Sequence, residues 1–126
     1  MALLPNLLTL LVALIHIYIL LLETVLWTHP AYGRRIFRMT AEFAEQTRLL
    51  AVNQGVYNGF LALGLLWGIW HPVPTVGAQV KLFFLGCVCV AGWVGAVTVG
   101  RRVFWVQSFP AAVAGVAVVL GAGVPW

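Results

Sequence analysis

Apolar residues fill four long runs of the chain, and short polar segments separate them. The runs cover about residues 6–27, 49–70, 80–99 and 103–120. Each is close to the roughly 20 residues that an α-helix needs to cross a hydrocarbon core of about 30 Å. The pattern therefore predicts an all-α integral membrane protein. We expect a single domain, residues 1–126, in which four transmembrane helices form an antiparallel bundle.

The segments between the runs carry the signals that start and stop helices. Thr28–Met39 is a polar linker with a proline, a glycine and three arginines, and Thr40 is a candidate N-cap. A helix is then expected over Ala41–Trp70, with its first turns outside the bilayer. His71 precedes a proline, which disfavours helical geometry at that residue, and the connection continues to about Gly77.

Basic residues are distributed unevenly over the three connections. Two connections carry most of them: Arg34, Arg35, Arg38 and Arg48 flank the first, and Arg101 and Arg102 lie in the third. The second has only Lys81 at its edge. Because basic residues favour the cytoplasmic side, connections 1–2 and 3–4 are predicted to be cytoplasmic and both termini to lie outside. The pattern suits a multi-pass protein of the cell inner (plasma) membrane.

The composition supports a lipid bilayer as the principal partner and argues against nucleic acid. Hydrophobic residues make up 63% of the chain and charged residues 8%, against roughly a quarter charged in soluble domains. The net charge of +4 is the excess of seven basic over three acidic residues, and the basic residues lie at helix ends. Cys87 and Cys89 lie about 200° apart around one apolar helix, so we expect packing residues and no disulfide.

Glycines spaced four apart mark the faces where helices approach closely. The expected packing positions are Gly55 and Gly59, Gly64 and Gly68 on the second run, and Gly92 and Ala96 on the third. On the second run the two pairs are rotated by roughly 140° from each other, so that helix is expected to touch two neighbours. Packing within the chain is the simpler interpretation, and a homo-oligomer through one of these faces is the alternative.

A strongly polar stretch, Asn53–Gly59, interrupts the second apolar run. Such side chains find no partners in lipid and must face protein, water or a ligand. His16 and Glu23 share a face of the first run, and Gln107 lies at a similar depth on the fourth. We therefore predict a buried polar cluster toward the cytoplasmic side, with two members closer to the midplane. The cluster consists of Glu23, Asn53, Gln54, Tyr57 and Gln107, with His16 and Asn58 nearer the midplane.

Four stretches resemble a known family of small bacterial membrane proteins, the domain of unknown function 1304. They read HIYILLLETVLWT, EFAEQTRLLAVNQGVYNGFLALGLLWG, LGCVCVAGWVGAVT and FWVQSFPA. The similarity covers nearly the whole chain, and the run NQGVYNGFLA is its most specific part. The resemblance implies a four-helix integral membrane protein. It supplies no activity and therefore no catalytic residue.

Glu23 and His16 each have a structural and a functional interpretation. Glu23 either bonds to Asn53 or Gln54 or reaches Arg34 or Arg35, or else it binds a proton or cation. His16 either packs in the bundle, relays a proton to Glu23, or ligates a haem iron. No cofactor is expected, because no second histidine lies within a span to complete a haem site. No metal site is expected either, since the remaining histidines fall on opposite sides of the membrane in this topology.

Three hypotheses for function follow. The first is a small transporter or ligand-binding protein with a polar intramembrane pocket open to the cytoplasm, in which Glu23 is the ionisable element. Four helices enclose only a small pathway, so this hypothesis expects a homo-oligomer. The second is a membrane-embedded enzyme that acts on a lipophilic substrate with His16 and Glu23 as acid and base. It is less favoured, because no nucleophile or metal motif is recognisable. The third is a non-catalytic structural or accessory subunit.

Overall fold

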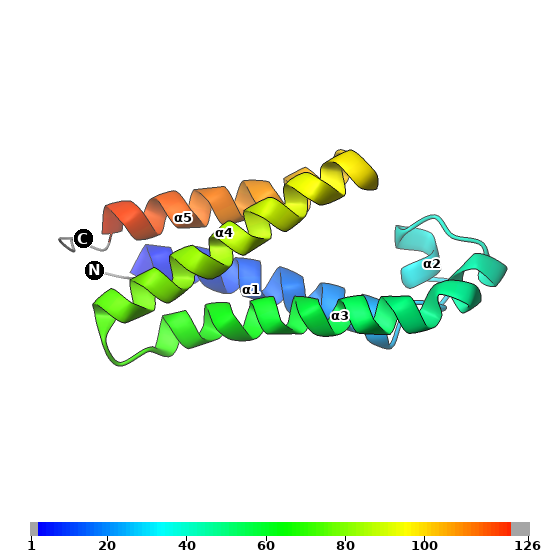
Figure 1. The fold of residues 1–126 in the computed structure, drawn as a ribbon, viewed down its shortest axis with the longest axis horizontal. Coiled ribbons are helices and arrows are strands. Elements are labelled where there is room, and N and C mark those ends of the chain that lie inside the picture. The colour runs from blue at the N-terminus through cyan, green and yellow to red at the C-terminus, as the bar shows by residue number, and fades with distance from the viewer. Residues whose placement is uncertain (1–2, 122–126) are drawn as a thin grey trace. The chain divides into compact units, whose positions relative to one another are not determined.

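The helices seen in the structure account for most of residues 3–121, the part of the chain that the computed structural model describes (Figure 1). Within that part there are five α-helices, one π-helical segment and no β-strand. Their bounds are α1 Leu3–Thr24, α2 Gly33–Ile36, α3 Ala41–Trp70, α4 Pro74–Thr98, η1 Phe104–Ser108 and α5 Phe109–Gly121. The predicted domain also includes residues 1–2 and 122–126, which lie outside the described residues.

Four helical stretches are long and apolar enough to cross a membrane: α1, α3, α4, and η1 with α5 together. This confirms the all-α fold class and is the pattern of a multi-pass membrane protein. α3 begins and ends where the sequence predicts. Its N-terminus is capped by the Thr40 hydroxyl, which accepts a hydrogen bond of 3.1 Å from the Phe43 amide.

The start of α4 differs from the prediction by about two turns. The sequence suggested a helix from about residue 80, but α4 begins at Pro74. Proline suits the first position of a helix, because its fixed φ is already helical and its missing N–H has no partner to lose there. Lys81 consequently lies within α4 and not at the edge of a connection, which corrects the sequence-based placement.

The end of α1 also differs, because the helix stops at Thr24, before the apolar run is finished. The amides of Val25 and Leu26 both bond to the Leu21 carbonyl at 3.0 Å, which widens the last turn. The chain then folds back, and the Gly33 amide donates to the Leu26 carbonyl at 3.0 Å. This return turns part of the predicted linker into the short helix α2.

The π-helical segment η1 is the second element that the pattern did not predict. Its signature is the bond from the Phe109 amide to the Phe104 carbonyl, five residues back. Pro110 follows directly, and a proline ring crowds the carbonyl four residues before it, here that of Val106. A widened turn is a common way for a helix to accommodate such a disruption.

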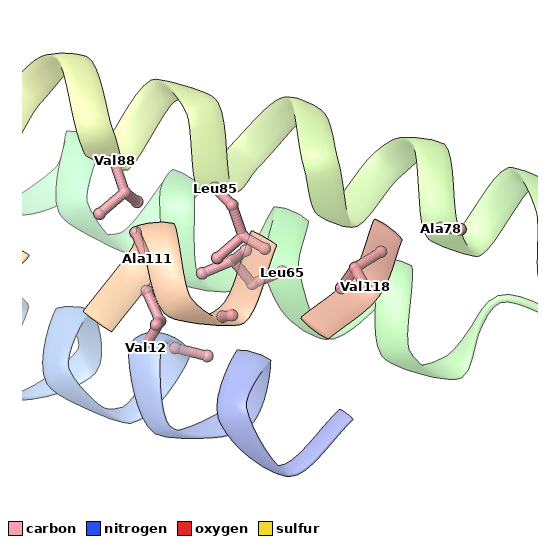
Figure 2. Close-up of a cluster of buried hydrophobic side chains, with 9 residues drawn as sticks. Val12, Leu65, Ala78, Leu85, Val88, Ala111 and Val118 are labelled. Atoms are coloured by element: carbon pink, nitrogen blue, oxygen red, sulfur yellow. The ribbon is translucent and has the colours of Figure 1, made fainter. Parts of the chain in front are cut away.

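Packing divides the described chain into two compact units, residues 3–15 with 61–121, and residues 16–60. In the first unit, α1, α3, α4 and α5 all contribute to one apolar core (Figure 2). Its buried members are Val12, Ala13, Leu65, Ala78, Leu85, Val88, Ala111, Ala114 and Val118. Four of these nine are alanines, and small residues let helices approach closely where lipid provides no hydrophobic drive.

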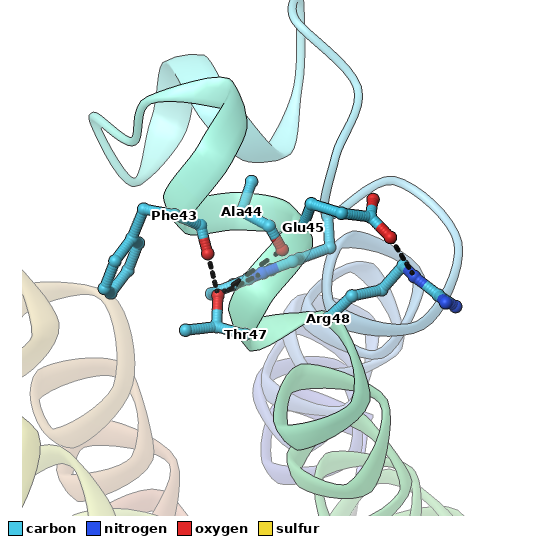
Figure 3. A network of polar contacts seen from close by, with 6 residues as sticks. Phe43, Ala44, Glu45, Thr47 and Arg48 are labelled. Atoms are coloured by element: carbon cyan, nitrogen blue, oxygen red, sulfur yellow. Dashed lines mark hydrogen bonds and ion pairs between the residues drawn. The ribbon is translucent and has the colours of Figure 1, made fainter.

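The second unit, residues 16–60, comprises the end of α1, the helix α2 and the first part of α3. Hydrogen bonds fasten the connection to α3, because the Trp27 indole Nε1 donates to the Thr47 hydroxyl at 3.0 Å. Figure 3 shows this part of α3, where Thr47 Oγ1 also donates to the Phe43 carbonyl at 2.7 Å. On the same turns Arg48 Nε pairs with Glu45 Oε1 at 3.2 Å.

Candidate functional site

Gly55 permits a close approach between α1 and α3 in the second unit. A Cβ atom at this position would lie 2.8 Å from Thr24 Cγ2 and 3.0 Å from Glu23 Cβ. Such distances leave no room for any side chain, so the glycine is what allows the two helices to meet here. Gly59, one turn later, faces Leu20 of α1, where an added Cβ would lie 3.4 Å from Leu20 Cδ2, at the edge of ordinary van der Waals contact.

This approach brings the Glu23 carboxylate next to the polar stretch of α3. Asn58 Nδ2 donates a hydrogen bond of 2.8 Å to Glu23 Oε2. The same nitrogen also donates to the Gln54 carbonyl oxygen at 3.3 Å. Asn58 is buried and Glu23 is half-buried. Both hydrogens of the amide therefore have acceptors, which fixes its orientation toward the carboxylate.

The partner of Glu23 is not one of those that the sequence suggested. We expected Asn53, Gln54, Arg34 or Arg35, and the bond is made by Asn58. Among the described residues the only ion pair joins Arg48 to Glu45, so neither Arg34 nor Arg35 pairs with Glu23. The spacing could not reveal this partner, because the choice depends on how deeply Gly55 lets the helices approach.

Three members of the predicted buried cluster are exposed. The side chains of Asn53 and Gln54 are exposed, and 55% of Tyr57 is exposed, with its ring 5.9 Å from that of Phe60. The prediction that they are buried beside Glu23 is therefore wrong. The polar arc of about 140° is wider than the seam that one neighbouring helix covers, so only Asn58 falls within the contact. Ligand binding by these residues stays a prediction.

The two remaining candidates lie at different places in the chain. His16 is fully buried, at 0% exposure, in the middle of α1. Gln107 is half-buried and belongs to η1, in the first unit. Among residues 3–121, no three histidine, cysteine, aspartate or glutamate side chains gather in a geometry that suits a metal ion.

The π-helical segment makes a reciprocal contact with α4 in the first unit. Ser108 Oγ donates to the Cys89 carbonyl at 2.8 Å, and Cys89 Sγ donates weakly to the Ser108 carbonyl at 3.7 Å. Gly92 permits this contact, because a Cβ there would clash with Ser108 Oγ and lie 2.7 Å from its amide nitrogen. The Ser108 hydroxyl is thus bound to a main-chain carbonyl and serves helix packing.

The other candidate packing positions lie against α4 or remain half-buried. A Cβ on Gly64 would meet the ring of Phe84, and one on Gly68 would lie 2.6 Å from Lys81 Cγ. The first glycine pair of α3 thus lies against α1 and the second against α4. Ala96 on α4 is half-buried.

Lys81 is a buried cation that sequence reasoning did not recognise as one. It is 6% exposed, and its Nζ donates to Asn6 Oδ1 of α1 at 2.6 Å. The signal was present in Pro74, since a helix that starts there carries Lys81 two turns into the span. Gly68 was a second signal of a close helix contact, and in the structure the stem of Lys81 packs against it.

A shallow apolar groove of about 370 Å³ runs between α4 and α5. Its lining is almost entirely apolar, and Gly86 and Gly115 each border open space. The lining residues are Leu82, Leu85, Gly86, Cys89, Ala111, Ala112, Gly115, Val116, Val119 and Leu120. Such a surface offers no group for acid–base chemistry and suits hydrocarbon.

Comparison with known proteins identifies the family of this chain. Residues 10–119 match the family model described as protein of unknown function (DUF1304). The chain belongs to the DUF1304 family. It is 34% identical over 110 residues to the uncharacterized protein YpaA of Lactococcus lactis subsp. lactis (strain IL1403), covering 86% of this chain and 90% of the relative. No solved structure matches it. The resemblance noted from the polar run of α3 is thereby confirmed.

Proposed function

We propose that this chain is a small membrane transport protein that binds a proton or a cation at Glu23. The observation that carries the proposal is the bond of 2.8 Å between Asn58 Nδ2 and Glu23 Oε2, within the closely packed pair α1–α3. Of the three acidic residues, Glu23 alone lies inside an apolar run, because Glu42 and Glu45 belong to the first turns of α3. Burying a carboxylate in an apolar span costs free energy, and such a residue is therefore a candidate site for a proton or a cation.

The chemistry of the pair supports exchange of the bound ion. An amide donor favours a carboxylate without neutralising it, so the charge is left for a proton or a cation to balance. A permanent arginine partner would occupy that role. In the described residues, the ion pair is the one between Arg48 and Glu45, and Glu23 takes no part in it. The site is therefore suited to a reversible counter-charge.

The topology proposed from the charges gives this site a direction. With connections 1–2 and 3–4 in the cytoplasm of a cell with an inner (plasma) membrane, Glu23 lies in the cytoplasmic half of its span. Because four helices enclose a small pathway, we further propose a homo-oligomer as the transporting form. Native mass spectrometry of the detergent-solubilised protein tests this point, and a monomer at all concentrations contradicts it.

Flux into proteoliposomes tests the proposed function. The full chain is reconstituted with an internal dye sensitive to pH or to sodium, and a gradient of the corresponding ion is imposed. We expect the wild-type protein to raise the flux of one of these ions at least fivefold above empty liposomes. Glu23→Gln should abolish that gain, because the glutamine can still accept the bond from Asn58 but holds no charge. Glu45→Gln, at an exposed position beside Arg48, is the matched control.

A purely structural role is the competing function, and one observation favours it. Both hydrogens of the Asn58 amide already have acceptors, Glu23 Oε2 and the Gln54 carbonyl. An interhelical bond of this kind stabilises a bundle by about 0.6–2 kcal/mol. If the contact only fixes packing, Glu23→Gln leaves flux unchanged and alters thermal stability alone. Equal flux of wild type and variant would therefore contradict the transport proposal.

A further inference from the structure

Arg38 occupies a backbone conformation that arginine rarely adopts. Its φ is 53°, in the left-handed region. Among the described residues, no other non-glycine residue has a positive φ. It ends α2 in a Schellman arrangement: the Met39 amide bonds to the Arg34 carbonyl at 2.8 Å and the Arg38 amide to the Arg35 carbonyl at 3.4 Å. Glycine is the residue that this position favours. A non-glycine residue held in this conformation is a candidate for a functional role.

The arginines of this turn have no acidic partner. The whole chain contains three acidic residues, all glutamates. Glu23 accepts from Asn58, Glu42 accepts from Gln46 Nε2 at 3.4 Å, and Glu45 pairs with Arg48. Arg34, Arg35 and Arg38 thus form three neighbouring positive charges without an ion pair in the described structure. Such a group leaves its charge available to an anion from outside the described chain.

The Arg34 side chain adds a second, independent sign of a missing acceptor. Its Nε atom is buried and has no hydrogen-bond partner within residues 3–121. A buried donor left without an acceptor is uncommon, and it indicates that some group normally completes it. Arginine presents its donors in a planar fork that matches phosphate oxygens, and phosphate is the anion best suited to several guanidinium groups.

The surroundings of the turn place this anion at a membrane surface. α2 follows within nine residues of the end of α1, a span of the membrane. Two exposed aromatic side chains belong to this stretch: Tyr32 precedes the arginines, and Phe37 directly precedes Arg38 and packs its ring 4.9 Å from that of Trp27. Aromatic residues of this kind concentrate at the level of lipid headgroups. The turn therefore combines aromatic rings and guanidinium groups at the depth of lipid phosphates.

The turn is also held in place, so that its charges are preset. Gly33 packs directly against the carbonyls of Leu26 and Trp27, where a Cβ would clash. Trp27 is bonded in turn to Thr47 of α3. A rigid support lowers the entropy that binding must overcome.

We propose that the turn formed by Arg34, Arg35 and Arg38 binds the phosphate of an anionic phospholipid headgroup. Lipid binding here is independent of ion binding at Glu23 and goes beyond the proposed function. Arg35 and Arg38, which are exposed, reach the phosphate, and Arg34 adds its positive charge beside them. Arg38 is held in its strained conformation because its charge completes the site.

Lipid-dependent thermal stability of the purified full chain tests this proposal. The detergent-solubilised protein is melted with phosphatidylglycerol, with phosphatidylcholine, or with inorganic phosphate. We expect phosphatidylglycerol to raise the melting temperature by several degrees more than phosphatidylcholine, and inorganic phosphate to have little effect. Native mass spectrometry should show phosphatidylglycerol bound at least tenfold more tightly than phosphatidylcholine.

Two variants separate binding from folding. Arg38→Gly relieves the left-handed residue, so the lipid-free protein should melt at the same or a higher temperature, while the gain from phosphatidylglycerol falls by half or more. Arg34→Gln should lower the same gain. Arg102→Gln, at an exposed arginine of another connection, is the control and should keep it. Equal stabilisation by the two lipids, full stabilisation by inorganic phosphate, or an undiminished gain in Arg38→Gly would overturn the proposal.

Discussion

At the scale of single residues, two charged side chains in the interior, Lys81 and Glu23, form hydrogen bonds with neutral asparagine amides. Lys81 donates to Asn6 and Glu23 accepts from Asn58, and each bond joins α1 to another helix. Neutral partners do not cancel the charge that they bind, so each pair remains electrostatically incomplete. Such pairs are expensive to break from one side, because the remaining charge then has no partner in a poorly solvated place.

The pair formed by Asn6 and Lys81 gives a prediction about stability. Asn6→Leu should destabilise the protein by about 1–3 kcal/mol, because it leaves a buried ammonium without its acceptor. Lys81→Met keeps the volume of the stem beside Gly68 and removes the charge, so its effect should be near zero or stabilising.

A double-mutant cycle measured by thermal unfolding in detergent checks this prediction. The double variant with Asn6→Leu and Lys81→Met should recover most of the loss seen for Asn6→Leu alone. Strictly additive effects of the two changes would show that the bond of 2.6 Å contributes nothing.

At this scale the sequence predicted which residues need partners but not which partners they take. Glu23 stood out as a carboxylate in an apolar run, and the polar stretch of α3 was the correct place to look. Around the helix, Asn58 lies about 40° from Gln54 and about 140° from Asn53. The choice of Asn58 therefore depends on the rotation of the helix, which apolar patterning alone does not fix. Lys81 was missed because its position depends on where α4 begins.

At the scale of elements, the helices were predictable and their irregular ends were not. Length and hydropathy identify α3 to its terminal residues, since a good N-cap and a proline delimit it. Apolar patterning predicts neither α2, where the Gly33 amide bonds back to the Leu26 carbonyl, nor the widened turn of η1, where Ser108 bonds to Cys89 of α4. Pro110 was the one local sign that the last helix is irregular.

The contact between α4 and η1 should be sensitive to one added methyl group. Gly92→Ala places a Cβ against Ser108 and should destabilise the protein by about 1–3 kcal/mol, as overpacking does. Gly86→Ala on the same helix meets open space, so it should change stability by less than about 1 kcal/mol. Thermal unfolding of both variants checks the prediction, and equal losses would contradict the assigned contact.

At the scale of the whole molecule, the chain belongs to the DUF1304 family and has four helical stretches long and apolar enough to cross a membrane, and the topology remains a prediction from charge. The arginines of the first and third connections predict that both face the cytoplasm. Labelling of introduced cysteines in intact cells checks this, in a background in which Cys87 and Cys89 are replaced by alanine.

A cysteine at Val73, in the second connection, should react with a membrane-impermeant maleimide added outside. One at Ala31, in the first connection, should react only after the cells are opened. The reverse pattern would invert the proposed topology and move Glu23 to the outer half of its span.

The central claim is that Glu23 takes up a proton or cation inside the membrane, and carbodiimide labelling tests it most directly. Dicyclohexylcarbodiimide enters the hydrocarbon core and modifies protonated carboxyl groups there, and mass spectrometry of the digested protein locates the adduct. We predict that Glu23 is labelled in native membranes several times faster than Glu42 or Glu45, and that its labelling slows as the pH rises. Labelling of Glu23 no faster than that of the two exposed glutamates would contradict the account.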